Sequence, residues 1–160
     1  MCLAYECVNA SPGDTCDAPF MIDDLPFYQA GDTSDATPDY YYGAGECEGV
    51  LPGYGVAGSD EVFQFTPSAT GAFTFTVQAG FDPTLYIVTD CADITNSCVQ
   101  AVETGANSEV LSVYLQQGVT YFFVVDYWSN LNNDGGPYAL NVEQTCVSNC
   151  VGKQCGGDGC

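Results

Sequence analysis

Apolar and polar side chains alternate with a period of two along several short stretches of this chain. Residues 72–78 read AFTFTVQ, and residues 109–115 place Leu111, Val113 and Leu115 on one face. This period is that of a β-strand with one buried face, because successive side chains of a strand point to opposite sides. Further strands are predicted at residues 61–66, 85–89, 121–127 and 138–143, with additional ones near 20–27 and 98–102.

Turn-forming residues separate these stretches, at 67–71, 80–83, 117–118 and 134–137, and no helical period interrupts them. Residues 121–127 are apolar on both faces until Asp126, which is typical of a central strand that is buried on both sides. The sequence therefore predicts an all-β fold, an antiparallel β-sandwich that is jelly-roll-like and stapled by disulfides.

The charge of the chain excludes several classes of function. Its 160 residues include 21 acidic side chains but a single cation, Lys153, and no His, for a formal net charge of -20. Such a chain repels nucleic acid, since phosphate binding needs Lys or Arg. Without imidazole it lacks Ser-His-Asp and Cys-His catalytic arrangements, so we predict no enzyme activity. No apolar run approaches the length of a membrane span, so no membrane insertion is expected.

Ten cysteines in an acidic chain that is nearly free of Lys and Arg favour disulfides and an extracellular location. The start, MCLAYEC, does not resemble a signal peptide, which suggests a mature or trimmed chain. We predict one bridge from Cys91 to Cys98 across a short loop, and a second from Cys16 to Cys47. The other six can pair in 15 ways, with zinc on the last four as the alternative; they are Cys2, Cys7, Cys146, Cys150, Cys155 and Cys160.

Three regions follow from this distribution. Residues 1–15 form an N-terminal segment that bears two cysteines, residues 16–145 form the strand-rich domain, and residues 146–160 form a tail rich in Cys and Gly. The tail is too short and too rich in glycine for a core of its own, so covalent bonds must hold its shape.

Acidic loops make calcium the expected cofactor, because Ca²⁺ prefers six to eight oxygen ligands from carboxylates, amides and backbone. The pair Asp60 and Glu61, which opens a strand, is one candidate. Asp126 is a second, since a carboxylate in apolar surroundings needs a cation or several donors; the alternative is a strand-end Asp in water. Other candidates lie in two loops, with Asp32, Asp35 and Asp39 in one and Asn130, Asn132, Asn133 and Asp134 in the other. Solvated loop carboxylates are the alternative for these.

Aromatic residues offer one more candidate site. Trp128 and the run Tyr40 to Tyr42 would suit a platform for a sugar or protein ligand. Packing of these tyrosines over the rim of the sandwich is the interpretation that we prefer.

Three blocks in fixed order resemble a bacterial pre-peptidase C-terminal domain. They are GSDEVFQFTPSATGAFTFTV, FDPTLYIVTDC and GVTYFFVVDYWSNLNNDGGPYALNV, and the resemblance spans residues 13–145. It implies a non-catalytic β-sandwich of extracellular proteins that sometimes binds calcium. It also implies an acidic position at the strand start that Asp60 and Glu61 occupy here, which makes this pair the strongest single candidate for calcium. The tail resembles Cys-rich repeats of secreted proteins from myxobacteria and their neighbours.

Two functions are compatible with these features. In the first, the chain is a calcium-binding structural subunit that self-associates into an extracellular filament or surface layer, with divalent ions offsetting its charge. In the second, it is an accessory domain of a larger secreted enzyme or adhesin and binds an extracellular protein or glycan. We favour the first, because the chain offers little besides a sandwich and two cysteine-bearing ends.

Overall fold

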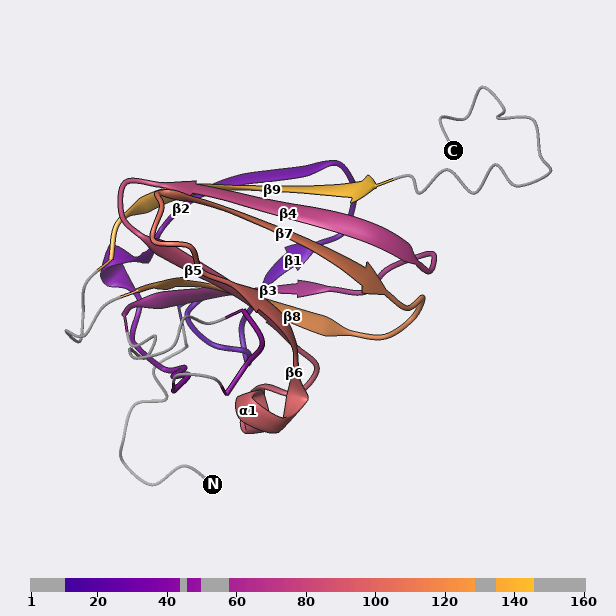
Figure 1. Cartoon of the computed structure of the whole chain (residues 1–160), viewed down its shortest axis with the longest axis horizontal. Coiled ribbons are helices and arrows are strands. Elements are labelled where there is room, and N and C mark those ends of the chain that lie inside the picture. Colours follow the sequence, from indigo (N-terminus) through magenta and orange to yellow (C-terminus); the bar gives the residue numbers. More distant parts are fainter. Residues whose placement is uncertain (1–10, 44–45, 50–57, 129–134, 146–160) are drawn as a thin grey trace.

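The computed structural model describes residues 11–43, 46–49, 58–128 and 135–145 (Figure 1). These residues form strands and three short helical turns. The strands are β1 (Phe20–Ile22), β2 (Phe27–Asp32), β3 (Asp60–Phe65), β4 (Gly71–Ala79), β5 (Pro83–Val88), β6 (Cys98–Val102), β7 (Ser108–Leu115), β8 (Tyr121–Tyr127) and β9 (Pro137–Thr145). The helical turns are η1 (Thr33–Asp35), η2 (Cys91–Asp93) and α1 (Ile94–Ser97).

The strands form two packed sheets, with the order β1-β3-β8-β5-β6 in one and β2-β9-β4-β7 in the other. If β2 is counted as strand 1 and β9 as strand 8, the four-stranded sheet has the order 1-8-3-6. The strands β3, β8, β5 and β6 of the five-stranded sheet then have the order 2-7-4-5, and β1 is an additional strand at the edge. This is the strand order of a jelly roll. All pairs are antiparallel except β1 with β3, which adds a parallel edge strand. The predicted jelly-roll-like sandwich is confirmed.

The main core lies between the two sheets and consists mainly of aromatic and branched side chains. Phe75 of β4 stacks on Phe123 of β8 with ring centroids 3.7 Å apart, and Phe65 of β3 contacts both rings. The alternation in β4 and β7 supplies one layer of this core, as the period of two predicts.

The five-stranded sheet is also buried on its other face. Every residue of β5 is buried, and β8 lies in the middle of the sheet as predicted for a strand that is apolar on both faces. Figure 1 shows that the described parts of the segment between β2 and β3 cross this outer face, on the side away from the other sheet. Tyr42 is fully buried there, packs edge-on against Tyr86 with centroids 4.7 Å apart, and donates to the Ile94 carbonyl. We call residues 36–43 and 46–49 the cover.

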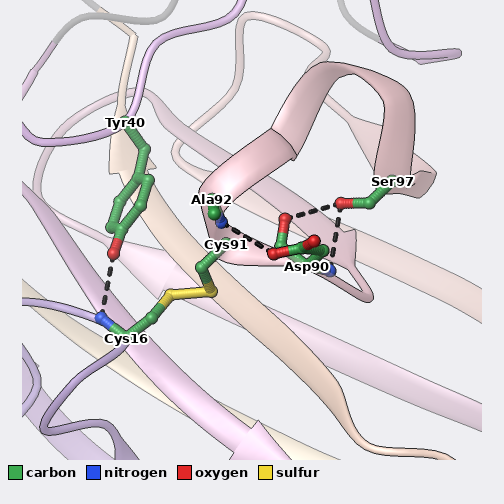
Figure 2. The surroundings of a disulfide bond; sticks show 6 residues. All are labelled: Cys16, Tyr40, Asp90, Cys91, Ala92 and Ser97. Carbon is green, nitrogen blue, oxygen red and sulfur yellow. Dashed lines mark hydrogen bonds between the residues drawn. A yellow bond between two sulfur atoms is a disulfide. The ribbon is translucent and has the colours of Figure 1, made fainter.

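One disulfide joins the segment before β1 to the start of η2, and a second joins the cover to the start of β6. Cys16 is bonded to Cys91, and Cys47 is bonded to Cys98, so both predicted pairings are wrong although all four residues are bridged. The loop from Asp90 to Ser97 is closed instead by hydrogen bonds, in which the Ser97 hydroxyl donates to the Asp90 carbonyl and accepts from the Asp90 amide (Figure 2). Cys91, which lies in this loop, and Cys98, which follows it, are each bonded to a cysteine of a distant segment.

The predicted strand at residues 20–27 is also corrected. It is two strands, with β1 beside β3 in one sheet and β2 beside β9 in the other. Between them Asp23 and Asp24 are exposed, and the chain crosses there from one sheet to the other. A pattern of alternating side chains does not show where a strand changes sheet.

We expect removal of either disulfide to lower the free energy of unfolding by about 2–4 kcal/mol, because each closes a long loop of 75 or 51 residues. The double variants C16A/C91A and C47A/C98A would be compared with the oxidised protein by urea denaturation. Each should unfold at a lower midpoint, and protease cleavage within the cover should become faster. An unchanged midpoint in both variants would contradict a structural role for these bonds.

Candidate metal centre

Two carboxylates face each other beneath the cover. Asp60 of β3 lies directly opposite Asp126 of β8, and Thr84 of β5 lies opposite Asp126 on its other side. All three are fully buried. Residues paired across neighbouring strands share one face, so the register alone places these oxygen-bearing side chains in a row.

Each carboxylate is only partly hydrogen-bonded. The Oδ2 atom of Asp60 accepts from the backbone amides of Asp39 (3.0 Å) and Tyr40 (3.2 Å), both in the cover. The Oδ2 atom of Asp126 accepts from the Tyr86 hydroxyl at 3.2 Å. The Oδ1 atoms of both aspartates and the hydroxyl of Thr84 are buried without a hydrogen-bond partner, as is that of Ser59. Buried oxygens of this kind are costly unless a donor or a cation meets them.

Burial dominates the electrostatics of the pair. It raises the pKa of Asp60 to about 8, against the two backbone amides that lower it, and the Asp39 charge raises it further. Burial and then the Asp60 charge raise the pKa of Asp126 well above its usual range, against the Tyr86 hydroxyl and the backbone amides of Tyr127 and Gly58, which lower it. Two adjacent carboxylates in an apolar setting cannot both be ionised without a compensating charge.

The sequence provides almost no cation for that purpose. It contains no Arg or His, and Lys153 lies outside the described residues. Protons or a metal ion must then neutralise the pair. The donor set fits a hard cation such as Ca²⁺, which takes oxygen ligands at about 2.3–2.6 Å. Asp60, Asp126 and Thr84 would supply part of its shell. In the part of the chain that the structure describes, no three His, Cys, Asp or Glu side chains gather as ligands, so hydroxyl, backbone or water oxygens would complete it.

The other predicted acidic residues do not join this pair. Glu61 points to the opposite face of β3, where its carboxylate accepts from the Tyr138 hydroxyl within the main core. Asp32 accepts from the Ser34 amide at the start of η1, and Asp35 is exposed in that turn. Asp39 contributes its backbone amide to Asp60, while its carboxylate accepts from Thr37.

Several predicted residues lie outside the described residues. These are the loop group Asn130, Asn132, Asn133 and Asp134, together with Cys2, Cys7, Cys146, Cys150, Cys155 and Cys160. Predictions about their ligands and bridges stay predictions, as does the division at residues 15 and 146.

The tyrosine run packs against the sheet, which is the interpretation that the sequence favoured. Tyr42 is fully buried, and the Tyr40 hydroxyl accepts from the Cys16 amide at 2.9 Å, as Figure 2 shows. Trp128 is partly buried against the same cluster. Tyr41, with 58% of its surface exposed, is the member of the run that faces solvent. The four residues therefore do not form a continuous aromatic platform.

Sequence reasoning missed two residues of the site, Thr84 and Tyr86. The sequence did contain a signal for Thr84, because it is a polar residue at the start of an apolar run. That run forms a strand that is buried on both faces. Tyr86 gave no signal, since a tyrosine in a strand is ordinary.

No family model and no curated protein matches the sequence. Among solved structures, the pre-peptidase C-terminal domain of collagenase from Bacillus anthracis superposes with a TM-score of 0.51 at 14% identity, covering 84% of this chain and 100% of that one. The lysozyme inhibitor PliG from Aeromonas hydrophila gives a TM-score of 0.44 at 11% identity, with 79% and 96% covered. The chain thus has the fold of a pre-peptidase C-terminal domain, which confirms the resemblance at the level of the fold.

Two further observations bear on the setting of the domain. The bridges Cys16–Cys91 and Cys47–Cys98 are typical of proteins that fold in an oxidising compartment. Among the described residues, none of the helices has the length and apolar character of a membrane span.

Without metal, the protein should lose stability as pH rises from about 4 to about 8. The folded pKa of Asp60 exceeds its ordinary value of 3.8, so the folded state binds protons more tightly than the unfolded state over this window. The stabilisation from the proton bound to Asp60 is complete below the pKa of this group in the unfolded state. It disappears as pH rises through the pKa of the group in the folded state. We would measure denaturation midpoints in chelator across this range for the wild type and Asp60→Asn. The variant should show a flatter profile, and identical profiles would contradict the assignment.

Proposed function

We propose that this chain is a non-catalytic, calcium-binding β-sandwich module and that it acts as a structural subunit of an extracellular filament or surface assembly. The observation that carries the calcium site is the buried pair Asp60 and Asp126, whose Oδ1 atoms have no hydrogen-bond partner. A divalent cation would satisfy these oxygens, neutralise both carboxylates and attach β3 to β8 beneath the cover.

Burial of the pair also supports a non-catalytic role. Paired carboxylates are a catalytic arrangement that the composition leaves open, but a substrate must reach them. Asp60 and Asp126 have no exposed surface, because the cover and the neighbouring strands enclose them. An enclosed pair suits an ion that becomes part of the structure.

Calcium should raise the free energy of unfolding of the wild type by about 2.7 kcal/mol when the free ion exceeds its dissociation constant a hundredfold. The melting temperature should rise with it. Asp126→Asn should lose this increase, since it removes one ligand and the charge that holds the ion. Asp24→Asn is the matched control, because it removes one carboxylate from an exposed position. Melting curves in chelator and in millimolar Ca²⁺, at pH 8, would be compared for the three proteins.

The chelator curves show whether each variant folds. A calcium shift retained by Asp126→Asn and equal to that of the control would overturn the site. A shift lost equally by both variants would assign the effect to diffuse surface charge instead.

The structural role rests on charge and on the ends of the chain. Copies of a chain with net charge -20 repel each other, so association requires cations to offset the repulsion. Six cysteines lie in the two terminal segments, which places thiols for intersubunit bridges at both ends of the sequence. Calcium would then promote assembly both by stabilising the subunit and by lowering its net charge.

Electron microscopy of the native protein in millimolar Ca²⁺ tests this role. We expect ordered assemblies that disperse after chelation, and Mg²⁺ at equal concentration is the control for general screening. Isolated particles in both conditions would contradict self-assembly and would favour the second candidate below.

The second candidate is an accessory binding domain of a larger secreted protein. A shallow groove on the outer face of the four-stranded sheet favours it. Tyr28, which is 69% exposed, lines this groove together with Thr76, Gln78, Ala139 and Asn141. An aromatic ring beside uncharged amides and hydroxyls suits a neutral glycan. The collagenase domain of similar fold is itself part of a larger protein by its description.

A further inference from the structure

Strand β7 is an open edge of the four-stranded sheet. It is eight residues long, and among the described residues it pairs with β4 alone. The unpaired amides and carbonyls of such an edge are a template for another strand, and proteins commonly protect long edges with charges, prolines or bulges. Outward along β7 stand Ser108, Val110, Ser112 and Tyr114, none of them charged.

The other edges are shorter or better protected. β1 has three residues. In β6 the register with β5 shifts, and the Ala101 amide donates to the Glu48 carbonyl of the cover. β2 ends at Asp32, close in sequence to the exposed Asp35, and follows the exposed Asp23 and Asp24.

The outward face of β7 also differs from the other edge strands in charge. Its one acidic residue, Glu109, points inward with 1% of its surface exposed, and its carboxylate accepts from the amide and hydroxyl of Thr104. Two exposed apolar side chains lie on the outward face instead, Val110 at 55% and Tyr114 at 66%. In a chain of net charge -20, a second copy meets the least repulsion at a surface of this kind.

We propose that β7 pairs with β7 of a second copy, antiparallel about a two-fold axis, so that two four-stranded sheets become one continuous sheet. Pairing centred on Ser112 sets Val110 of one copy opposite Tyr114 of the other, on the same face. Aromatic and β-branched residues in that relation stabilise antiparallel pairs. The contact is isologous and closes as a dimer, which would be the repeating unit of the assembly. This inference rests on the proposed self-association.

Tyr114→Asp tests the interface, because it adds a like charge next to the two-fold contact. Tyr28→Asp is its matched control, since Tyr28 has similar exposure on the same sheet face but stands on the opposite edge strand. Sedimentation velocity over a concentration series in millimolar Ca²⁺ would be run on both variants and the wild type. We expect the wild type to dimerise, Tyr114→Asp to associate at least ten-fold more weakly, and Tyr28→Asp to match the wild type.

Hydrogen exchange on the wild type gives a readout that does not depend on variants. Amides of β7 should gain protection as concentration rises, while those of β2 should not. Association of Tyr114→Asp equal to wild type, or equal loss in both variants, would overturn the β7 interface and leave self-association standing. A wild type that stays monomeric in calcium would overturn self-association, and the interface with it.

Discussion

The central strands of the five-stranded sheet are apolar on both faces, and the rest of the structure depends on burying both. One face packs against the four-stranded sheet, through Phe63, Phe65 and Phe123. The other needs a second layer, which the cover supplies although it has almost no regular secondary structure. Because such a segment gains little from its own hydrogen bonds, its position depends on side-chain burial, above all that of Tyr42, and on the disulfide of Cys47 with Cys98.

This second layer buries two carboxylates that the strand register places opposite each other. Asp60 and Asp126 would be strand-end carboxylates in water if the outer face were open. Beneath the cover they lose solvent, their pKa values rise, and oxygens of both remain without donors. Backbone amides of Asp39 and Tyr40 fix one side of Asp60, so the cover both encloses the acidic pair and orients one of its two carboxylates. Formation of the Cys47–Cys98 bridge and cation binding would therefore support each other, since both hold the cover in place.

The distribution of charge gives the two sheets different roles. Three of the most exposed large apolar side chains, Tyr28, Val110 and Tyr114, lie on the outer face of the four-stranded sheet, at its two edge strands. The rest of this face carries mostly small and uncharged residues such as Thr76 and Ala139, with Asp32 and Glu143 as exceptions. The five-stranded sheet holds the buried acidic pair under the cover. Contacts with other molecules are accordingly expected on one side, and ion binding on the other.

Local patterns in the sequence predicted most of the strands and the sandwich, and its composition excluded histidine chemistry. Alternation in residues 72–78 and 109–115 marked strands with one buried face, and the apolar run before Asp126 marked β8 as central. Both signals are local, because side-chain direction follows from backbone geometry. Tertiary structure alone decided which distant residues meet: Asp60 with Asp126, Cys16 with Cys91 and Cys47 with Cys98. The alternation within β3, by contrast, is local, and it places Glu61 on the opposite face from its neighbour Asp60. The contacts between distant residues depend on strand order, register and the path of the cover, which are set when the whole chain packs and which no local pattern encodes.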